Sequence, residues 1–209
     1  YELFVAPFEQ DISWSAEGIK GARRFLNRIW SLYKETYYES VTASGIDQEL
    51  ERLLHKTIRQ VSERIDGFRF NMVVSALMEF TNALKERQRS GNWRSETFDH
   101  ALETLLILLA PVVPHISEEL WHLTRHNGSV LQQSWPNWDD ELAREETEEI
   151  AIQVDGKLRG VITVEADMDE ANVKEQAIAH PKVQQHIAGR EISKIYYVPG
   201  RIVNIVTRR

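Results

Sequence analysis

Residues 148–164 read Glu-Glu-Ile-Ala-Ile-Gln-Val-Asp-Gly-Lys-Leu-Arg-Gly-Val-Ile-Thr-Val, and here the periodicity of the chain changes. Ile150, Ile152 and Val154 alternate with other residues, which is the period of a half-buried strand. Asp155-Gly156 suits a two-residue turn in which both positions take positive φ. Because the alternation resumes beyond the turn, we predict an antiparallel β-hairpin.

The residues that follow complete a small α+β domain over 148–209. Asp169 is placed to cap a helix, and Pro181 can begin a second, shorter one. Pro199-Gly200 suits a type II turn between two further strands. We expect helices over 169–179 and 181–189, and strands over 191–198 and 201–207.

Upstream of the hairpin the apolar residues instead repeat at helical spacing. In the first such stretch they fall at Ile19, Ala22, Leu26, Ile29 and Tyr33. Comparable stripes, with serine caps and prolines at the expected positions, predict five helices joined by short connections. They begin with a cap at Ser15, continue over 46–66 and 70–89, run from Ser95 to Pro111, and end with 114–125.

The predicted fold is therefore mainly α: an antiparallel helical bundle followed by a small α+β domain. Residues 1–14 are mixed and aromatic, and we expect them to end a preceding region. Residues 15–138 form the bundle with an extended tail, and the acidic stretch 139–147 is expected to be a linker.

Composition excludes several classes of protein. The 209 residues include no cysteine, which removes disulfides, thiolate zinc sites and cysteine nucleophiles and fits a reducing cytosol. The longest apolar run, Leu105–Val113, contains a proline and is too short to span a membrane. The chain starts at Tyr1 within structured sequence, so we expect a fragment of a longer cytoplasmic protein, monomeric and without a membrane partner.

Basic residues form two ridges on the otherwise acidic bundle. The net charge is −7, yet residues 148–209 hold nine acidic and nine basic side chains, so the bundle carries the excess. Ridges at helical spacing could follow a phosphate backbone, although they could equally be solvated faces paired with glutamates. The ridge residues are Lys20, Arg24 and Arg28 on the first helix and Arg52, Lys56 and Arg59 on the second.

The α+β domain combines cations with aromatic and amide side chains, a combination that suits RNA. Strand alternation turns one of Tyr196 and Tyr197 inward, and the sequence leaves open which one. The candidate RNA-binding residues are Lys157, Arg159, Lys194, Tyr197, Arg201 and Asn204.

No catalytic centre emerges from the residues. The chain has no glycine-rich phosphate loop and no Gly-x-Ser-x-Gly motif. His115, Glu118 and His122 share one face of the fifth helix and could ligate a metal. Because that helix must also bury apolar residues, we expect surface and capping roles for them and neither a metal nor a cofactor.

Four segments carry a resemblance to leucyl-tRNA synthetases of the bacterial type. Residues 152–160 resemble that family's V-N-G-K-L-R-G segment, with Asp155 in place of the usual asparagine. Residues 195–206 are similar to its closing Y-V-P-G-K-L-V-N-I-V, with Arg201 in place of lysine. Residues 18–30 resemble the first helix of the anticodon-binding bundle, and residues 109–121 resemble a segment shared with the isoleucyl and valyl enzymes.

The resemblance implies a parent that joins leucine to tRNA(Leu) with ATP and Mg²⁺. Its nucleotide-binding signatures (His-Ile-Gly-His and Lys-Met-Ser-Lys-Ser types) and editing domain would lie in the remainder of the synthetase, so the chain alone is expected to be inactive. The bundle would lie along the tRNA body, and the last domain would reach its outer corner.

Two alternatives remain. The chain could be the equivalent part of an isoleucyl or valyl enzyme, although these commonly end in a cysteine-bound zinc module or a coiled-coil arm. It could also be a protein-interaction module that docks through its acidic surface.

Overall fold

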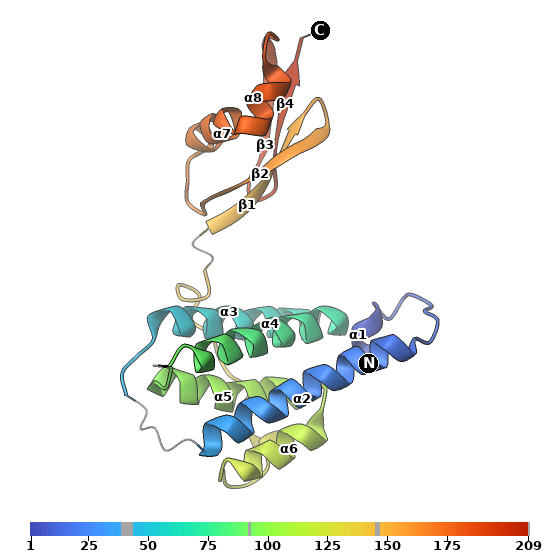
Figure 1. Cartoon of the computed structure of the whole chain (residues 1–209), viewed down its shortest axis with the longest axis vertical. Coiled ribbons are helices and arrows are strands. Elements are labelled where there is room, and N and C mark those ends of the chain that lie inside the picture. The colour runs from blue at the N-terminus through green and yellow to red at the C-terminus, as the bar shows by residue number, and fades with distance from the viewer. Residues whose placement is uncertain (39–43, 92, 145–146, 209) are drawn as a thin grey trace. The chain divides into compact units, whose positions relative to one another are not determined.

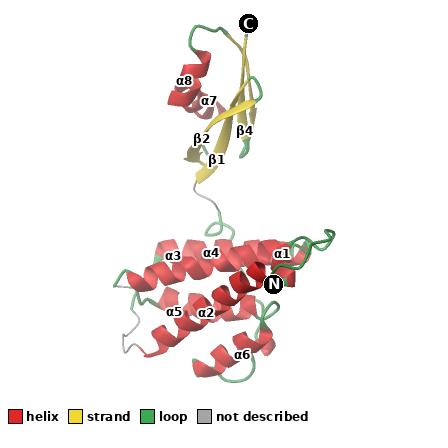
Figure 2. Ribbon diagram, turned by 45° about the vertical axis from the view of Figure 1, so that its right-hand side comes forward, coloured by secondary structure: helices red, strands yellow, loops and turns green. Residues whose placement is uncertain are grey.

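A computed structural model describes residues 1–38, 44–91, 93–144 and 147–208. The chain divides into two compact units, residues 1–144 and 145–209, and each is described here by itself. Unit 1 is helical, whereas unit 2 combines a sheet with two helices (Figures 1 and 2). The predicted fold class, a helical bundle followed by a small α+β domain, is confirmed.

Five helices build the bundle of unit 1. Ser95 and Asp47 cap two of them through side-chain oxygens that accept backbone N–H groups of the first turn. The fifth helix begins at Pro114. Proline has no N–H, and at the first position of a helix this costs no hydrogen bond, because an N–H there has no acceptor within the helix. The helices are α2 (Ala16–Tyr38), α3 (Gln48–Asp66), α4 (Phe70–Arg89), α5 (Glu96–Leu109) and α6 (Pro114–Leu123).

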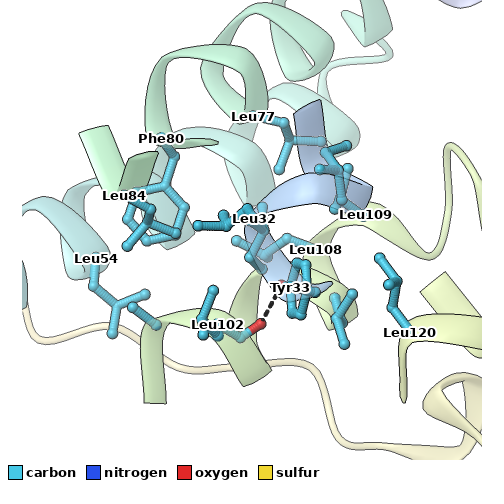
Figure 3. Packing of buried hydrophobic residues seen from close by; sticks show 14 of the residues in the cluster. Leu32, Tyr33, Leu54, Leu77, Phe80, Leu84, Leu102, Leu108, Leu109 and Leu120 are labelled. Carbon is cyan, nitrogen blue, oxygen red and sulfur yellow. Dashed lines mark hydrogen bonds between the residues drawn. The ribbon is translucent and has the colours of Figure 1, made fainter. Parts of the chain in front are cut away.

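The apolar stripes of these helices meet in one core (Figure 3). Leu32, Leu77 and Leu108 are fully buried there. Tyr33 is only 1% exposed, and its hydroxyl donates to the carbonyl oxygen of Leu102 at 2.6 Å. Burial raises the pKa of Tyr33 well above its usual value, so the phenol remains a neutral donor that joins α2 to α5.

The first residues pack on the bundle. The short helix α1 (Glu2–Val5) contacts α4, and Leu3 and Phe4 lie against the core. The Tyr1 hydroxyl accepts the backbone N–H of Ser15, whose own hydroxyl accepts the N–H of Gly18. The predicted cap at Ser15 is thus confirmed, and residues 1–14 belong to unit 1.

The segment after α6 lies along α3. It includes one 3₁₀ turn, η1 (Val130–Gln132), and the Trp135 indole donates to the Ser62 hydroxyl at 2.8 Å. The backbone N–H of Asp139 donates to Nδ1 of His55 at 2.9 Å, and Ala143 is fully buried. Residues 139–144 therefore form an ordered turn, which differs from the predicted linker over 139–147. Residues 145–146 of that linker lie outside the described part of the chain.

Unit 2 is a four-stranded sheet in the order β2-β1-β4-β3 with two helices on one face (Figure 2). β1 and β4 are parallel, and the outer strands pair antiparallel with them. Its core contains Ile152, Val173, Val183 and Val203. The elements are β1 (Thr147–Val154), β2 (Lys157–Glu165), α7 (Glu170–Ala179), α8 (Pro181–Ile187), β3 (Ile192–Val198) and β4 (Ile202–Thr207).

Both predicted turns are present. Asp155 and Gly156 take φ of 50° and 75° in the two-residue connection between β1 and β2. Gly200 has φ of 65°, and the N–H of Arg201 donates to the Val198 carbonyl at 3.1 Å, as a type II turn requires.

Candidate nucleic-acid interface

The basic ridge on α2 lies on the side of the helix away from the core. Lys20, Arg24 and Arg28 are all exposed. Lys20 pairs with Glu17 at 2.6 Å, and the Arg28 guanidinium donates to the amide oxygen of Asn82 on α4. An exposed ion pair contributes little to stability, so Lys20 can turn from Glu17 toward a phosphate. The exposed Arg28 can likewise exchange its hydrogen bond to Asn82 for one to a phosphate.

The ridge on α3 is less accessible than the sequence suggested. Arg52 is exposed, but Lys56 and Arg59 are half-buried. Arg59 lies at helical spacing between His55 and Ser62, the two residues that bond to the segment after α6. That segment therefore covers part of the predicted ridge.

The two ridges also lie on helices with different main neighbours. α2 packs mainly against α4 and α6, whereas α3 packs mainly against α4 and α5. The structure thus separates the two predicted ridges, and α2 presents the more open one.

In unit 2 the sheet has one face without helices, and strand pairing aligns its side chains in rows. We call it the open face. One row holds Val161, Ala151, Ile202 and Val198, in the strand order β2-β1-β4-β3. The next row holds Leu158, Gln153, Asn204 and Tyr196. Four of these side chains are strongly exposed: Leu158 at 62%, Tyr196 at 50%, Val161 at 49% and Val198 at 47%.

The structure decides between the two tyrosines. Tyr197 is half-buried and packs against the core beneath the helices, whereas Tyr196 stands on the open face. The Lys194 ammonium lies 4.7 Å from the centroid of the Tyr196 ring. Tyr197 was the predicted RNA-binding residue, and the exposed aromatic ring is that of Tyr196. The sequence contained an indication of this, because Lys194 and Tyr196 are two residues apart on one strand and must therefore lie on the same face of the sheet.

The remaining predicted residues of unit 2 do not form a single patch. Lys157 is exposed beside the β1–β2 turn. Arg159 is the extra residue of a β-bulge, because Ile152 pairs with Gly160 and the next pair skips it. Arg201 is exposed just before β4 begins, about 17 Å along the strand from Val206, the residue paired with Lys194.

Asn204 lies centrally on the open face and supports the hairpin. Its side-chain oxygen accepts the backbone N–H of Gly156 at 3.2 Å. Gln153 and Tyr196 are its partners on the neighbouring strands. The residue predicted to contact RNA is thus also bonded to the turn.

Two of the candidate metal ligands on α6, Glu118 and His122, take part in local structure, and the third, His115, is exposed. Glu118 contacts His122 at 3.2 Å, and its other oxygen accepts from the hydroxyl of Ser129 and the N–H of Val130. Partial desolvation raises the pKa of Glu118, but these hydrogen bonds together hold it below its usual value. Within the described ranges, no three metal-binding side chains cluster, and no helix is long and apolar enough to cross a membrane.

Comparison with known proteins gives the family. A family model described as the anticodon-binding domain of tRNA ligase matches residues 47–175. The chain belongs to this family. It is also 40% identical over 208 residues to the leucine–tRNA ligase of Dehalococcoides mccartyi, and 38% identical over 218 residues to that of Thermotoga maritima.

A solved structure is also similar to this family member. It is the ternary complex of Agrobacterium radiobacter K84 agnB2 LeuRS, tRNA and LeuAMS, with a TM-score of 0.75 and 30% sequence identity. The match covers 99% of this chain and 27% of that one. The chain spans about a quarter of the length of the curated relatives it matches, 26% for the two named here.

Proposed function

We propose that the chain binds and positions tRNA(Leu) as one part of a leucine–tRNA ligase. Leucine activation with ATP and Mg²⁺, and transfer to the tRNA, would take place in the remainder of a longer cytoplasmic protein. The observation that carries this proposal is the match of 99% of the chain to part of a synthetase whose structure contains tRNA.

The surface chemistry supports the same proposal. The α2 ridge supplies three exposed cations at helical spacing, which suits contacts to successive phosphates. The open face supplies Lys194, an aromatic ring and two amides, which suit exposed RNA bases. An acidic protein can bind RNA through such local surfaces because salt screens its more distant charges.

The test is the salt dependence of tRNA binding. Fluorescence anisotropy with labelled tRNA(Leu) should show affinity that falls linearly with the logarithm of salt concentration. Lys194→Ala and Arg201→Ala should each reduce the slope by about one, the value for one phosphate contact. Lys182→Ala is the matched control, since this exposed lysine lies on α8, the side of the sheet opposite the open face. Affinity that is absent or independent of salt would contradict the proposal.

A protein-interaction module is the second candidate. It is favoured by the charge of residues 1–147, which carry all of the net −7. That function predicts no salt-dependent tRNA affinity, so the same titration separates the two.

The purified chain should also fail to support ATP–pyrophosphate exchange, and detectable exchange would place activation chemistry within these residues.

A further inference from the structure

The open face places three kinds of side chain around one point. Tyr196 on β3 is directly opposite Asn204 on β4, and residues paired in this way have Cβ atoms about 5 Å apart. Lys194, two residues before Tyr196 on the same strand, holds its ammonium 4.7 Å from the ring centroid. An aromatic ring, an amide and a cation therefore adjoin one another on an exposed surface.

The amide has a fixed orientation. Because the Gly156 N–H donates to Oδ1 of Asn204, the opposite end of the side chain must be the NH₂ group. Among the hydrogen bonds of the described residues, none uses that NH₂ group. Asn204 can therefore donate a hydrogen bond to a ligand without first losing one.

We propose that Tyr196, Asn204 and Lys194 bind one unpaired nucleotide of the RNA, a role that rests on the proposed function. The base stacks on the Tyr196 ring, and the Asn204 NH₂ group donates to an acceptor atom on the edge of the base. Lys194 contacts the phosphate of the same nucleotide. A base inside a duplex cannot reach the ring in this way, so the site selects a loop or other unstacked position.

Charge favours RNA over a protein as the occupant of this face. No carboxylate belongs to the row that contains Asn204 and Tyr196, and none belongs to the adjoining pair of Lys194 and Val206. These positions hold one cation and two amides. The carboxylate of Asp155 lies beyond this pair, where it accepts the N–H and hydroxyl of Thr207 and pairs with Arg190 at 3.5 Å. Glu149, which also belongs to the open face, pairs with Thr163 beyond the apolar row of Val161. The potential beside Tyr196 therefore suits a phosphodiester.

The experiment compares two RNAs with the full 209-residue chain. Labelled tRNA(Leu) contains unpaired bases, and a blunt RNA duplex with a similar number of base pairs does not. Wild type, Tyr196→Ala, Tyr196→Phe and the control Val161→Ala are titrated by anisotropy at several salt concentrations. Val161→Ala removes exposed apolar surface from the same face without touching the tyrosine. Far-UV circular dichroism verifies that each variant is folded.

Tyr196→Ala should raise the Kd for tRNA by roughly 5- to 150-fold, the usual effect of losing one stacked base. The salt slope should stay unchanged, because no phosphate contact is removed. The Kd of Tyr196→Ala for the duplex should remain within about twofold of wild type. The same holds for the Kd of Tyr196→Phe and of Val161→Ala for tRNA.

Two results would overturn the inference while leaving the proposed function intact. One is a Tyr196→Ala variant that binds tRNA like wild type, as expected if the face covers a protein surface instead. The other is an equal loss of affinity for tRNA and duplex, which would assign Tyr196 to backbone contacts. A wild-type chain without salt-dependent tRNA binding would reject both proposals together.

Discussion

Lys85 is a buried cation of the bundle, and replacing it by methionine tests how α4 is joined to α2. The residue is 8% exposed, and its ammonium donates to the Ser31 hydroxyl at 2.8 Å and to Glu35 at 2.6 Å. A longer contact of 3.4 Å reaches the side-chain oxygen of Gln88. The NH₂ group of the same side chain donates to the Leu32 carbonyl and the Thr36 hydroxyl. Lys85→Met keeps the apolar stem and removes only the charge and its three contacts.

The expected cost follows from the burial of each partner. The Glu35 side chain is 54% exposed and rehydrates, so losing this pair costs only about 0–1 kcal/mol. The Gln88 oxygen is buried and is left without its donor, which costs about 1–3 kcal/mol. Methionine recovers part of this, because the ammonium no longer has to be desolvated. We expect Lys85→Met to lower the free energy of unfolding of unit 1 by about 1–2 kcal/mol.

This cost should depend on pH. The hydrogen bonds from Lys85 and Ser31 hold the pKa of Glu35 below its usual value. A carboxyl group whose pKa is lowered by folding stabilises the protein above its unfolded pKa and loses that contribution as pH falls through its folded pKa. The difference between wild type and variant should therefore be full at pH 7 and shrink as the pH falls below about 4.

Tryptophan fluorescence isolates the relevant unit. All six tryptophans lie between positions 14 and 138, within unit 1. Urea titrations of wild type and Lys85→Met, followed by this signal at pH 7 and at acidic pH, give the free energy of unfolding. Lys34→Met is the matched control, because this lysine of α2 is exposed. Equal stability of Lys85→Met and wild type at pH 7 would refute the reasoning, whereas a loss that does not change with pH would assign the whole cost to Gln88 and none to Glu35.

Three further substitutions test individual contacts. Gly160→Ala places a Cβ 2.7 Å from a carbon of the His180 ring. The free energy of unfolding of unit 2, measured by urea titration with circular dichroism, should fall by about 1–3 kcal/mol. Adding His180→Ala should relieve this loss. Tyr33→Phe removes a buried hydrogen bond to a backbone carbonyl of α5 and should cost unit 1 about 1–2 kcal/mol in the fluorescence assay. Asp155→Ala removes the acceptor of the Thr207 N–H and hydroxyl and puts alanine at positive φ, so the thermal midpoint of unit 2 should fall, whereas Asp155→Asn should retain most of the stability.

The helices and strands could be predicted because their periodicity is a local property. Each apolar stripe fixes the face of a helix that turns inward, and Asp155-Gly156 fixes the register of the hairpin through the φ values it tolerates. The Ser15 and Ser95 caps followed from side-chain chemistry within one turn. All of these signals act over a few residues.

Contacts between distant segments were beyond the same reasoning. The stripe of α3 shows that Arg59 points away from the core but does not show that the segment after α6 covers that side. The acidic stretch 139–144 has the composition of a linker, yet Asp139 accepts the N–H groups of Glu141 and Leu142 and closes a packed turn. In both cases contacts between α3 and the segment after α6 decide the outcome, because Trp135 bonds to Ser62 and the backbone N–H of Asp139 bonds to His55.

The two units would contribute in different ways to the free energy of RNA binding. The α2 ridge presents exposed lysine and arginine side chains that would contact phosphates, and phosphates are alike at every nucleotide. Tyr196 and Asn204 present a ring and a donor that can distinguish an unpaired base from a paired one. Salt should therefore weaken the first term steeply, whereas losing the ring at Tyr196 should leave the salt slope unchanged. Affinity measured at high salt would thus come increasingly from the open face, and there the effect of Tyr196→Ala relative to Arg24→Ala should be largest.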